Sequence, residues 1–242
     1  MSSFDDANHL VQYAREHFAE IEGAYSVSLS EKVIKPKLLI DIKNFMENLR
    51  SSLDFTAHGI FQKYGFSTSS NQKVYFPYAP LSKSKEEFRK SLRIDICIPG
   101  LSTSRPDIVE KIESYQHFFS PNNRWLPIFM DLNNENKHQQ LTPQIRKETK
   151  ELRISSGGAS ISMGPGALIS ISPGASIRLE KMVIPSRQDF DINKPPATIG
   201  SGKKEIITWI SFHFSTNNEP VLPLLKQTLV GIDRIVRELS AI

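Results

Sequence analysis

Residues 37–64 read KLLIDIKNFMENLRSSLDFTAHGIFQKY and carry the most regular apolar pattern in the chain. The apolar side chains recur every three or four residues, the spacing that places them on one face of an α-helix. Pro36 stands where proline favours a helix start, and Gly65 stands where glycine favours an end. A helix of this length spans roughly 40 Å. We therefore expect it to be the central helix of a bundle, with an apolar face of Leu38, Ile42, Phe45, Leu49, Leu53, Ala57 and Ile60.

Further helical patterns lie on both sides of this stretch. One covers residues 5–22, and Gly23 is expected to end it. A short helix is expected over residues 84–92, and a longer one from about residue 105 to residue 119. Another begins at Trp125 and continues toward His138. Together these patterns predict an N-terminal helical bundle.

The composition changes near residue 150, and an internal repeat follows. GASISM (158–163), GALISI (166–171) and GASIRL (174–179) repeat with a period of eight residues. Apolar and mostly polar residues alternate within each copy, which is typical of a half-buried strand. An antiparallel meander and a small solenoid both fit this pattern. We favour the meander, because three short copies bury little core for an independent solenoid.

The last part of the chain predicts one strand and one helix. Residues 205–214 are apolar on both faces, as in the central strand of a sheet. Asn217 or Asn218 can cap the final helix, with Glu219 and Pro220 in its first turn. This helix packs either on the sheet or on the bundle. The expected fold is α+β: a helical bundle in residues 1–150, then a small antiparallel β-sheet with a C-terminal helix in residues 151–242.

The overall composition excludes several classes of protein. The 242 residues include one cysteine, Cys97, so an intramolecular disulfide and a multi-cysteine zinc site are excluded. The net charge of +4 is too small to indicate a nucleic-acid-binding face, and the basic residues near position 150 alternate with acids as on a solvated helix. No apolar run has the length of a membrane span, and no signal peptide is evident. We expect a cytoplasmic protein that does not contact a membrane.

Arg50, Asp54 and His58 follow one another at steps of four residues on the central helix. One interpretation is a functional cluster, in which the carboxylate orients the histidine and the arginine binds an anion. The other is a structural stripe beside the apolar face, where pairs four residues apart add a few tenths of a kcal/mol. Both interpretations stay open.

A second polar group ends the helix that begins at Trp125. The run LNNENKH, residues 132–138, can present Lys137 and His138 to a site, with Asn134 as a further binding residue. Alternatively, Lys137 and His138 are solvated and offset the helix dipole at its C-terminal end.

These two motifs carry a resemblance to known proteins. LRSSLD (49–54) followed by LNNENKH resembles a group of uncharacterised bacterial proteins with an LRSxLD helix and a later LxxxxKH helix, over residues 35–142. The resemblance implies that Arg50, Asp54, Lys137 and His138 come together. The region is also weakly similar to the HEPN superfamily of helical bundles, many of them ribonucleases of toxin–antitoxin and antiphage systems. The spacing from Arg50 to His58 exceeds that of the HEPN catalytic signature.

Three functions follow as expectations. The first is a bacterial binding or regulatory protein in stress or antiphage defence, which binds RNA, a nucleotide or a protein partner. The second is a ribonuclease or related hydrolase, with His138 or His58 as general acid and base, Asp54 orienting it, and Arg50 or Lys137 stabilising the anionic transition state. The third is assembly through the short strands into a homo-oligomer. No metal or cofactor is expected.

Overall fold

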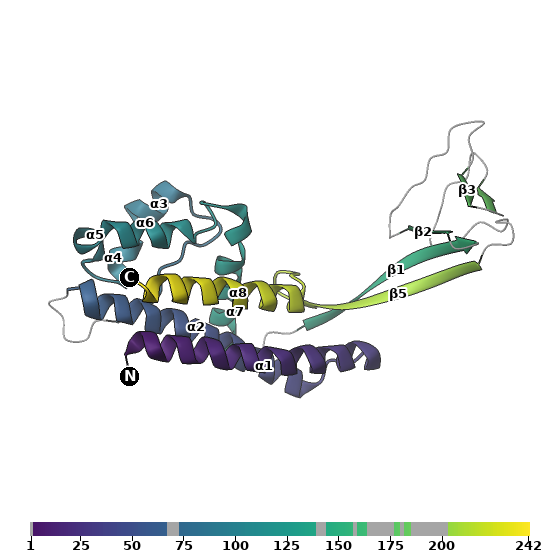
Figure 1. Cartoon of the computed structure of the whole chain (residues 1–242), viewed down its shortest axis with the longest axis horizontal. Helices are drawn as coiled ribbons and strands as arrows, with labels where there is room; N and C mark the ends of the chain where they lie inside the picture. The colour runs from purple at the N-terminus through teal and green to yellow at the C-terminus, as the bar shows by residue number, and fades with distance from the viewer. Residues whose placement is uncertain are drawn as a thin grey trace. The chain divides into compact units, whose positions relative to one another are not determined.

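The computed structural model describes residues 2–66, 73–138, 144–156, 159–163, 177–179, 182–184 and 203–242 (Figure 1). Side chains are described over residues 2–66, 73–135, 144–148 and 211–242. The chain forms two units, Met1–Ile145 with His213–Ile242, and Arg146–Phe212. The predicted α+β fold class is confirmed, since the chain is mostly helical with an N-terminal bundle, a small antiparallel sheet and a C-terminal helix.

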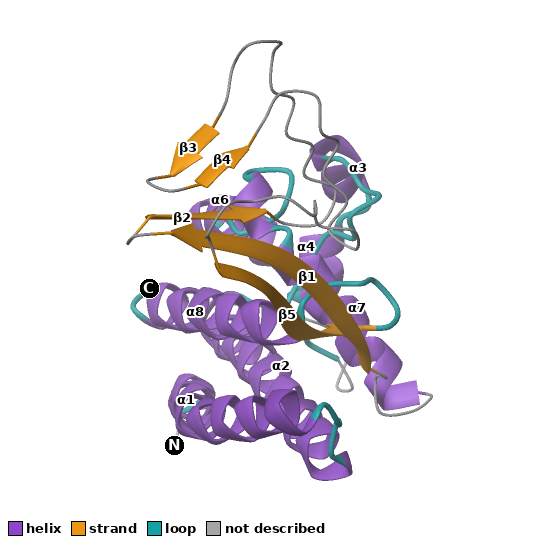
Figure 2. Ribbon diagram, turned by 90° about the vertical axis from the view of Figure 1, so that its right-hand side faces the viewer, coloured by secondary structure: helices purple, strands orange, loops and turns teal. Residues whose placement is uncertain are grey.

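The core of the first unit is formed by α2 and three helices that pack around it. The four helices are α1 (Ser3–Glu31), α2 (Pro36–Tyr64), α7 (Trp125–His138) and α8 (Val221–Ser240). Helix α2 contacts each of the other three, and α1, α2 and α8 lie side by side (Figure 2). All seven residues of the predicted apolar face of α2 are buried. The predicted role of this helix is therefore confirmed.

Helix α1 is longer than the sequence predicted. A capping box between Ser2 and Asp5 starts it, and it continues through Gly23 to Glu31. The expectation that Gly23 ends the helix is wrong. Tyr25 and Ser28 extend the buried face beyond it, and tertiary packing outweighs a glycine penalty of about 1 kcal/mol.

A group of short helices follows α2 and the segment of residues 73–80. These are α3 (Lys85–Lys90), α4 (Arg93–Cys97), α5 (Leu101–Ser104) and α6 (Pro106–Ser114), followed by the 3₁₀ helix η1 (Pro121–Asn123). The helices expected over residues 84–92 and 105–119 are present in shorter form. Residues 115–119 form turns rather than a continuation of α6.

Helix α8 returns to the bundle, the second of the two placements that the sequence allowed. Its apolar face contacts α1, α2 and α7, and Gly231 lets the Trp125 ring approach its backbone. Pro220, not an asparagine, is the residue before the first turn. The Asn217 side chain instead accepts a hydrogen bond from the Glu219 N–H (3.0 Å), which forms a turn ahead of the helix.

The strands form two small sheets. In the first, β1 (Gln144–Ser156) lies between β2 (Ala159–Met163) and β5 (Lys203–Phe214), and β1 and β2 are antiparallel. In the second, β3 (Ile177–Leu179) and β4 (Met182–Ile184) are antiparallel. The strand expected over residues 205–214 is confirmed as part of β5, but its expected central place is wrong, because β1 is the central strand of the described sheet and β5 is an outer one. Residues 144–150 belong to a strand, so the helical reading of the basic stretch is wrong.

The repeat is only partly described. Its first copy contains β2, and the end of its third copy is β3. Residues 164–176 lie outside the described ranges, so the choice between meander and solenoid stays a prediction. Within the described ranges, no helix has both the length and the hydropathy that crossing a membrane requires.

Two glycine substitutions test the helix packing. The Gly23→Ala variant should raise the free energy of unfolding by about 0.5–1 kcal/mol, because the new Cβ meets no neighbour within 4 Å. The Gly231→Ala variant should lower it by about 1–3 kcal/mol, because its Cβ falls on the Trp125 ring. Urea denaturation measures both. A destabilised Gly23→Ala protein would contradict the continuous α1 helix.

Candidate functional site

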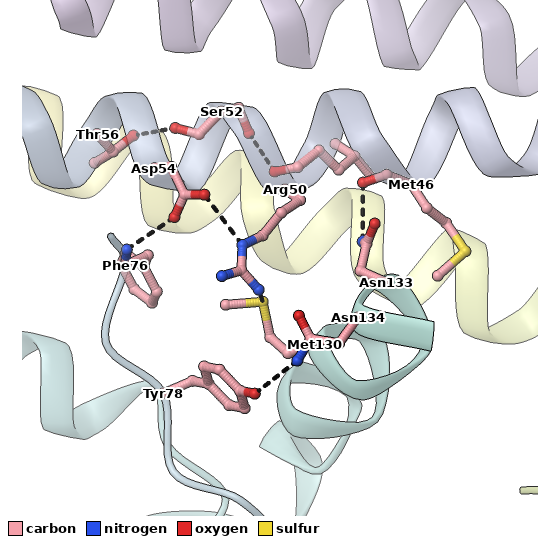
Figure 3. A network of polar contacts seen from close by, with 11 residues as sticks. Met46, Arg50, Ser52, Asp54, Thr56, Phe76, Tyr78, Met130, Asn133 and Asn134 are labelled. Atoms are coloured by element: carbon pink, nitrogen blue, oxygen red, sulfur yellow. Dashed lines mark hydrogen bonds and ion pairs between the residues drawn. The ribbon is translucent and has the colours of Figure 1, made fainter. Parts of the chain in front are cut away.

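The segment of residues 73–80 is irregular, yet four consecutive residues in it, Phe76 to Ala79, are buried. It passes α2 and α7 in Figure 3. Buried backbone groups outside helices and sheets need other hydrogen-bond partners. Neighbouring side chains supply several of them, and one predicted site residue, Asp54, is among these side chains.

Asp54 holds this segment against α2. Its Oδ1 accepts a hydrogen bond from the Phe76 N–H at 2.9 Å, and its Oδ2 accepts one from Arg50 Nε at 3.2 Å (Figure 3). Both carboxylate oxygens are therefore occupied by the fold itself. This geometry favours the structural interpretation of Asp54.

Arg50 links α2 to α7 and to the segment. Its side chain is only 11% exposed. The Nη1 atom lies 2.8 Å from Met130 Sδ, and the guanidinium carbon lies 5.9 Å from the centre of the Tyr78 ring. The Tyr78 hydroxyl in turn accepts a hydrogen bond from Asn134 Nδ2 at 3.2 Å. The structure thus brings together three predicted site residues, Arg50, Asp54 and Asn134.

His58 has a different environment. It is exposed, and its Nδ1 lies 3.1 Å from Ser3 Oγ on α1. In the described part of the chain, Asp54 makes no hydrogen bond to His58. Lys137 and His138 lie in the last turn of α7, and their side chains fall outside the described residues.

Gln116 is a buried anchor that the sequence analysis missed. Its Oε1 accepts from the Ala79 N–H at 2.9 Å, and its Nε2 donates to the carbonyls of Pro77 (3.3 Å) and Ile112 (3.0 Å). In the helix that the sequence predicts up to residue 119, Gln116 follows Ile112 by four residues and so puts a polar side chain on the apolar face. That mismatch is the sequence signal that could have identified it.

The electrostatic environment near the network is partly acidic. Burial, followed by repulsion from Glu135, raises the pKa of Asp131 on α7. Burial likewise raises the pKa of the Cys97 thiol, although Arg93 opposes the shift. Cys97 is a free cysteine and is buried. A neutral buried thiol is a poor nucleophile, since the thiolate is the reactive form.

A separate cavity of about 320 Å³ lies among α3, α4, α5 and α6. Two of its charged residues face each other, because Arg89 donates two hydrogen bonds of 2.6 Å to the Glu113 carboxylate. Asp95 accepts from the Ser102 N–H at 3.0 Å. Arg93 and Glu110 also line the cavity, and its apolar lining residues are Phe88, Leu92, Ile94, Pro106 and Val109.

Leu92, one of these wall residues, has an unfavourable backbone conformation. Its φ of 49° and ψ of 32° lie in the left-handed region, where a side chain other than glycine or asparagine costs roughly 1 kcal/mol or more. Its side chain does not offset this cost by core packing, because Leu92 is 63% exposed. The same left-handed conformation ends α1 at Lys32, and Leu92 comes just after α3, so this helix-ending geometry leaves an exposed apolar side chain at the cavity.

Comparison with protein-family models, curated proteins and solved structures finds no match to this chain. Over the described ranges, no three side chains of histidine, cysteine, aspartate or glutamate gather as a metal-binding group.

The anchoring role of Asp54 can be tested by its removal. The Asp54→Ala variant should lose about 1–3 kcal/mol of unfolding free energy, because it leaves the Phe76 N–H and the Arg50 guanidinium unpaired. The matched variant Asp107→Ala should change stability by less than about 0.5 kcal/mol, since Asp107 pairs with Arg105 at the surface. Thermal denaturation compares the two, and equal losses would contradict the anchoring role.

Proposed function

We propose that this protein is a binding or regulatory protein that takes a ligand into the cavity among α3, α4, α5 and α6. The observation that carries the proposal is Leu92, whose strained backbone holds an exposed apolar side chain at the cavity. Cavities of a few hundred Å³ with apolar walls and a few polar groups are typical of ligand sites. The cavity of about 320 Å³ is at the small end of that range.

The alternative function, a ribonuclease or related hydrolase, has less support. A general base must reach the proton that it removes, and its orienting group must hold it there. The Asp54 carboxylate is instead occupied by Phe76 and Arg50, and His58 contacts Ser3. Acidic side chains on α7, Asp131 and Glu135, also oppose the approach of a phosphate to the network.

Other parts of the proposal rest on the resemblance of the two sequence motifs alone. They are the HEPN-like assignment, the bacterial origin, the context of stress or antiphage defence, and the binding of RNA or a nucleotide. A cytoplasmic location and assembly into a homo-oligomer are likewise kept as proposals. None of these is needed for a ligand to enter the cavity.

A neutral fluorescent probe, N-phenyl-1-naphthylamine, tests occupancy of the cavity. We expect the folded protein to enhance its fluorescence and the Leu92→Asn variant to bind it about threefold to tenfold more weakly, because part of the apolar wall is lost. Leu92→Asn should also be more stable by about 1 kcal/mol, because asparagine tolerates the left-handed region. Urea denaturation supplies this second readout.

The control is Leu81→Asn, which changes another exposed leucine that does not line the cavity. It should bind the probe as the wild type does. Equal binding by Leu92→Asn and the wild type would refute the proposed site. RNA incubated with the protein should stay intact, and cleavage that is lost in a His58→Ala, His138→Ala variant would favour the hydrolase instead.

A further inference from the structure

The charges around the cavity define what kind of ligand it accepts. Arg89 and Glu113 neutralise each other through paired hydrogen bonds, and Asp95 is engaged by the Ser102 N–H. Glu110 is exposed and lies close enough to Arg89 to raise the pKa of that guanidinium. Arg89, Glu113 and Asp95 therefore have a hydrogen-bond partner within the fold. Glu110 has a cation, Arg89, nearby.

Arg93 differs from these groups. It lines the cavity, its residue is only partly exposed, and in the described residues it forms no hydrogen bond or ion pair with an acid. A partly desolvated cation gains more from an anionic partner than an exposed one does, because water screens it less. An arginine also forms two parallel hydrogen bonds to a carboxylate or phosphate group.

One ligand has to fill the apolar part of the cavity and also pair with Arg93, the one cation among the described lining residues that has no acidic partner. We propose that the cavity binds a small amphiphilic monoanion, with its hydrocarbon or ring part against Phe88, Ile94 and Val109 and its carboxylate or phosphodiester group on Arg93. This inference rests on the proposed binding function and specifies its ligand class. The lining selects for one negative charge.

A polyanion such as a nucleoside triphosphate fits less well. The acids in the lining outnumber the arginines, and Arg89 is already committed to Glu113. Additional phosphates would face Asp95 and Glu110 without a cation to balance them. A neutral apolar ligand would fill the walls but leave Arg93 without an anion.

Octanoate and 1-octanol, which share a hydrocarbon chain and differ in charge, test this inference. Each is used to displace N-phenyl-1-naphthylamine from the full-length protein. We expect the wild type to bind octanoate more tightly than 1-octanol. The Arg93→Gln variant should bind octanoate about tenfold more weakly, the loss of one charge-assisted contact, and should bind 1-octanol within about twofold of the wild type.

The matched control is Arg124→Gln, which removes an exposed arginine that does not line the cavity. It should leave both dissociation constants unchanged. Retained 1-octanol binding by Arg93→Gln shows that the variant is folded with an intact cavity.

The outcomes separate the two proposals. If Arg93→Gln binds octanoate as well as the wild type does, or if the wild type prefers 1-octanol, the ligand class is wrong. If the probe binds in a Leu92-dependent manner but octanoate does not displace it, the ligand class also fails while the proposed binding function stands. If Leu92→Asn binds the probe as tightly as the wild type does, the proposed function itself fails.

Discussion

The burial of the apolar face of α2 is the constraint on which the first unit depends. Helices α1, α7 and α8 all contact α2, and the residues of its apolar face are buried. Burying such side chains contributes about 1.5–3 kcal/mol for each large one, far more than any surface pair. The polar edge of the same helix, formed by Arg50 and Asp54, contacts the segment of residues 73–80 and holds it in place.

That polar edge connects the bundle to the cavity. Asp54 fixes Phe76, and the neighbouring Tyr75 N–H donates to the Cys97 carbonyl at the end of α4 (3.3 Å). Just after α2, the Phe66 N–H donates to the Pro99 carbonyl (3.0 Å). The α4 helix, with Leu92 and Arg93 at its start, is thus tied to the bundle on both sides of residues 67–72. Arg50 and Asp54 do not line the cavity, so under the proposed function they are positioning residues.

The sequence predicted those features that depend on local periodicity. The apolar pattern of α2 repeats at helical spacing along a helix of 29 residues, which distinguishes it from a strand. Residues 205–214 of β5 are apolar on both faces, which is typical of a strand in a sheet. Gly23 does not end α1, because the free-energy cost of a glycine inside a helix is smaller than the stabilisation gained by burying Tyr25 and Ser28. The three residues Arg50, Asp54 and His58 do not share one environment, for a geometric reason: each step of four residues rotates by about 40° around a helix, so two steps turn His58 toward Ser3 on α1. The cavity and Gln116 depend on contacts between distant segments, which no local pattern encodes.

The central claim is that ligand binding occurs among α3, α4, α5 and α6 and not at the Arg50 network. Backbone amide chemical shifts of the isotope-labelled protein, recorded by NMR during a titration with octanoate, test it most directly. We expect the largest changes in amide chemical shift at Leu92, Arg93 and Val109, which line the cavity. Changes centred on Arg50, Asp54 and Asn134, with the cavity residues unaffected, would contradict it.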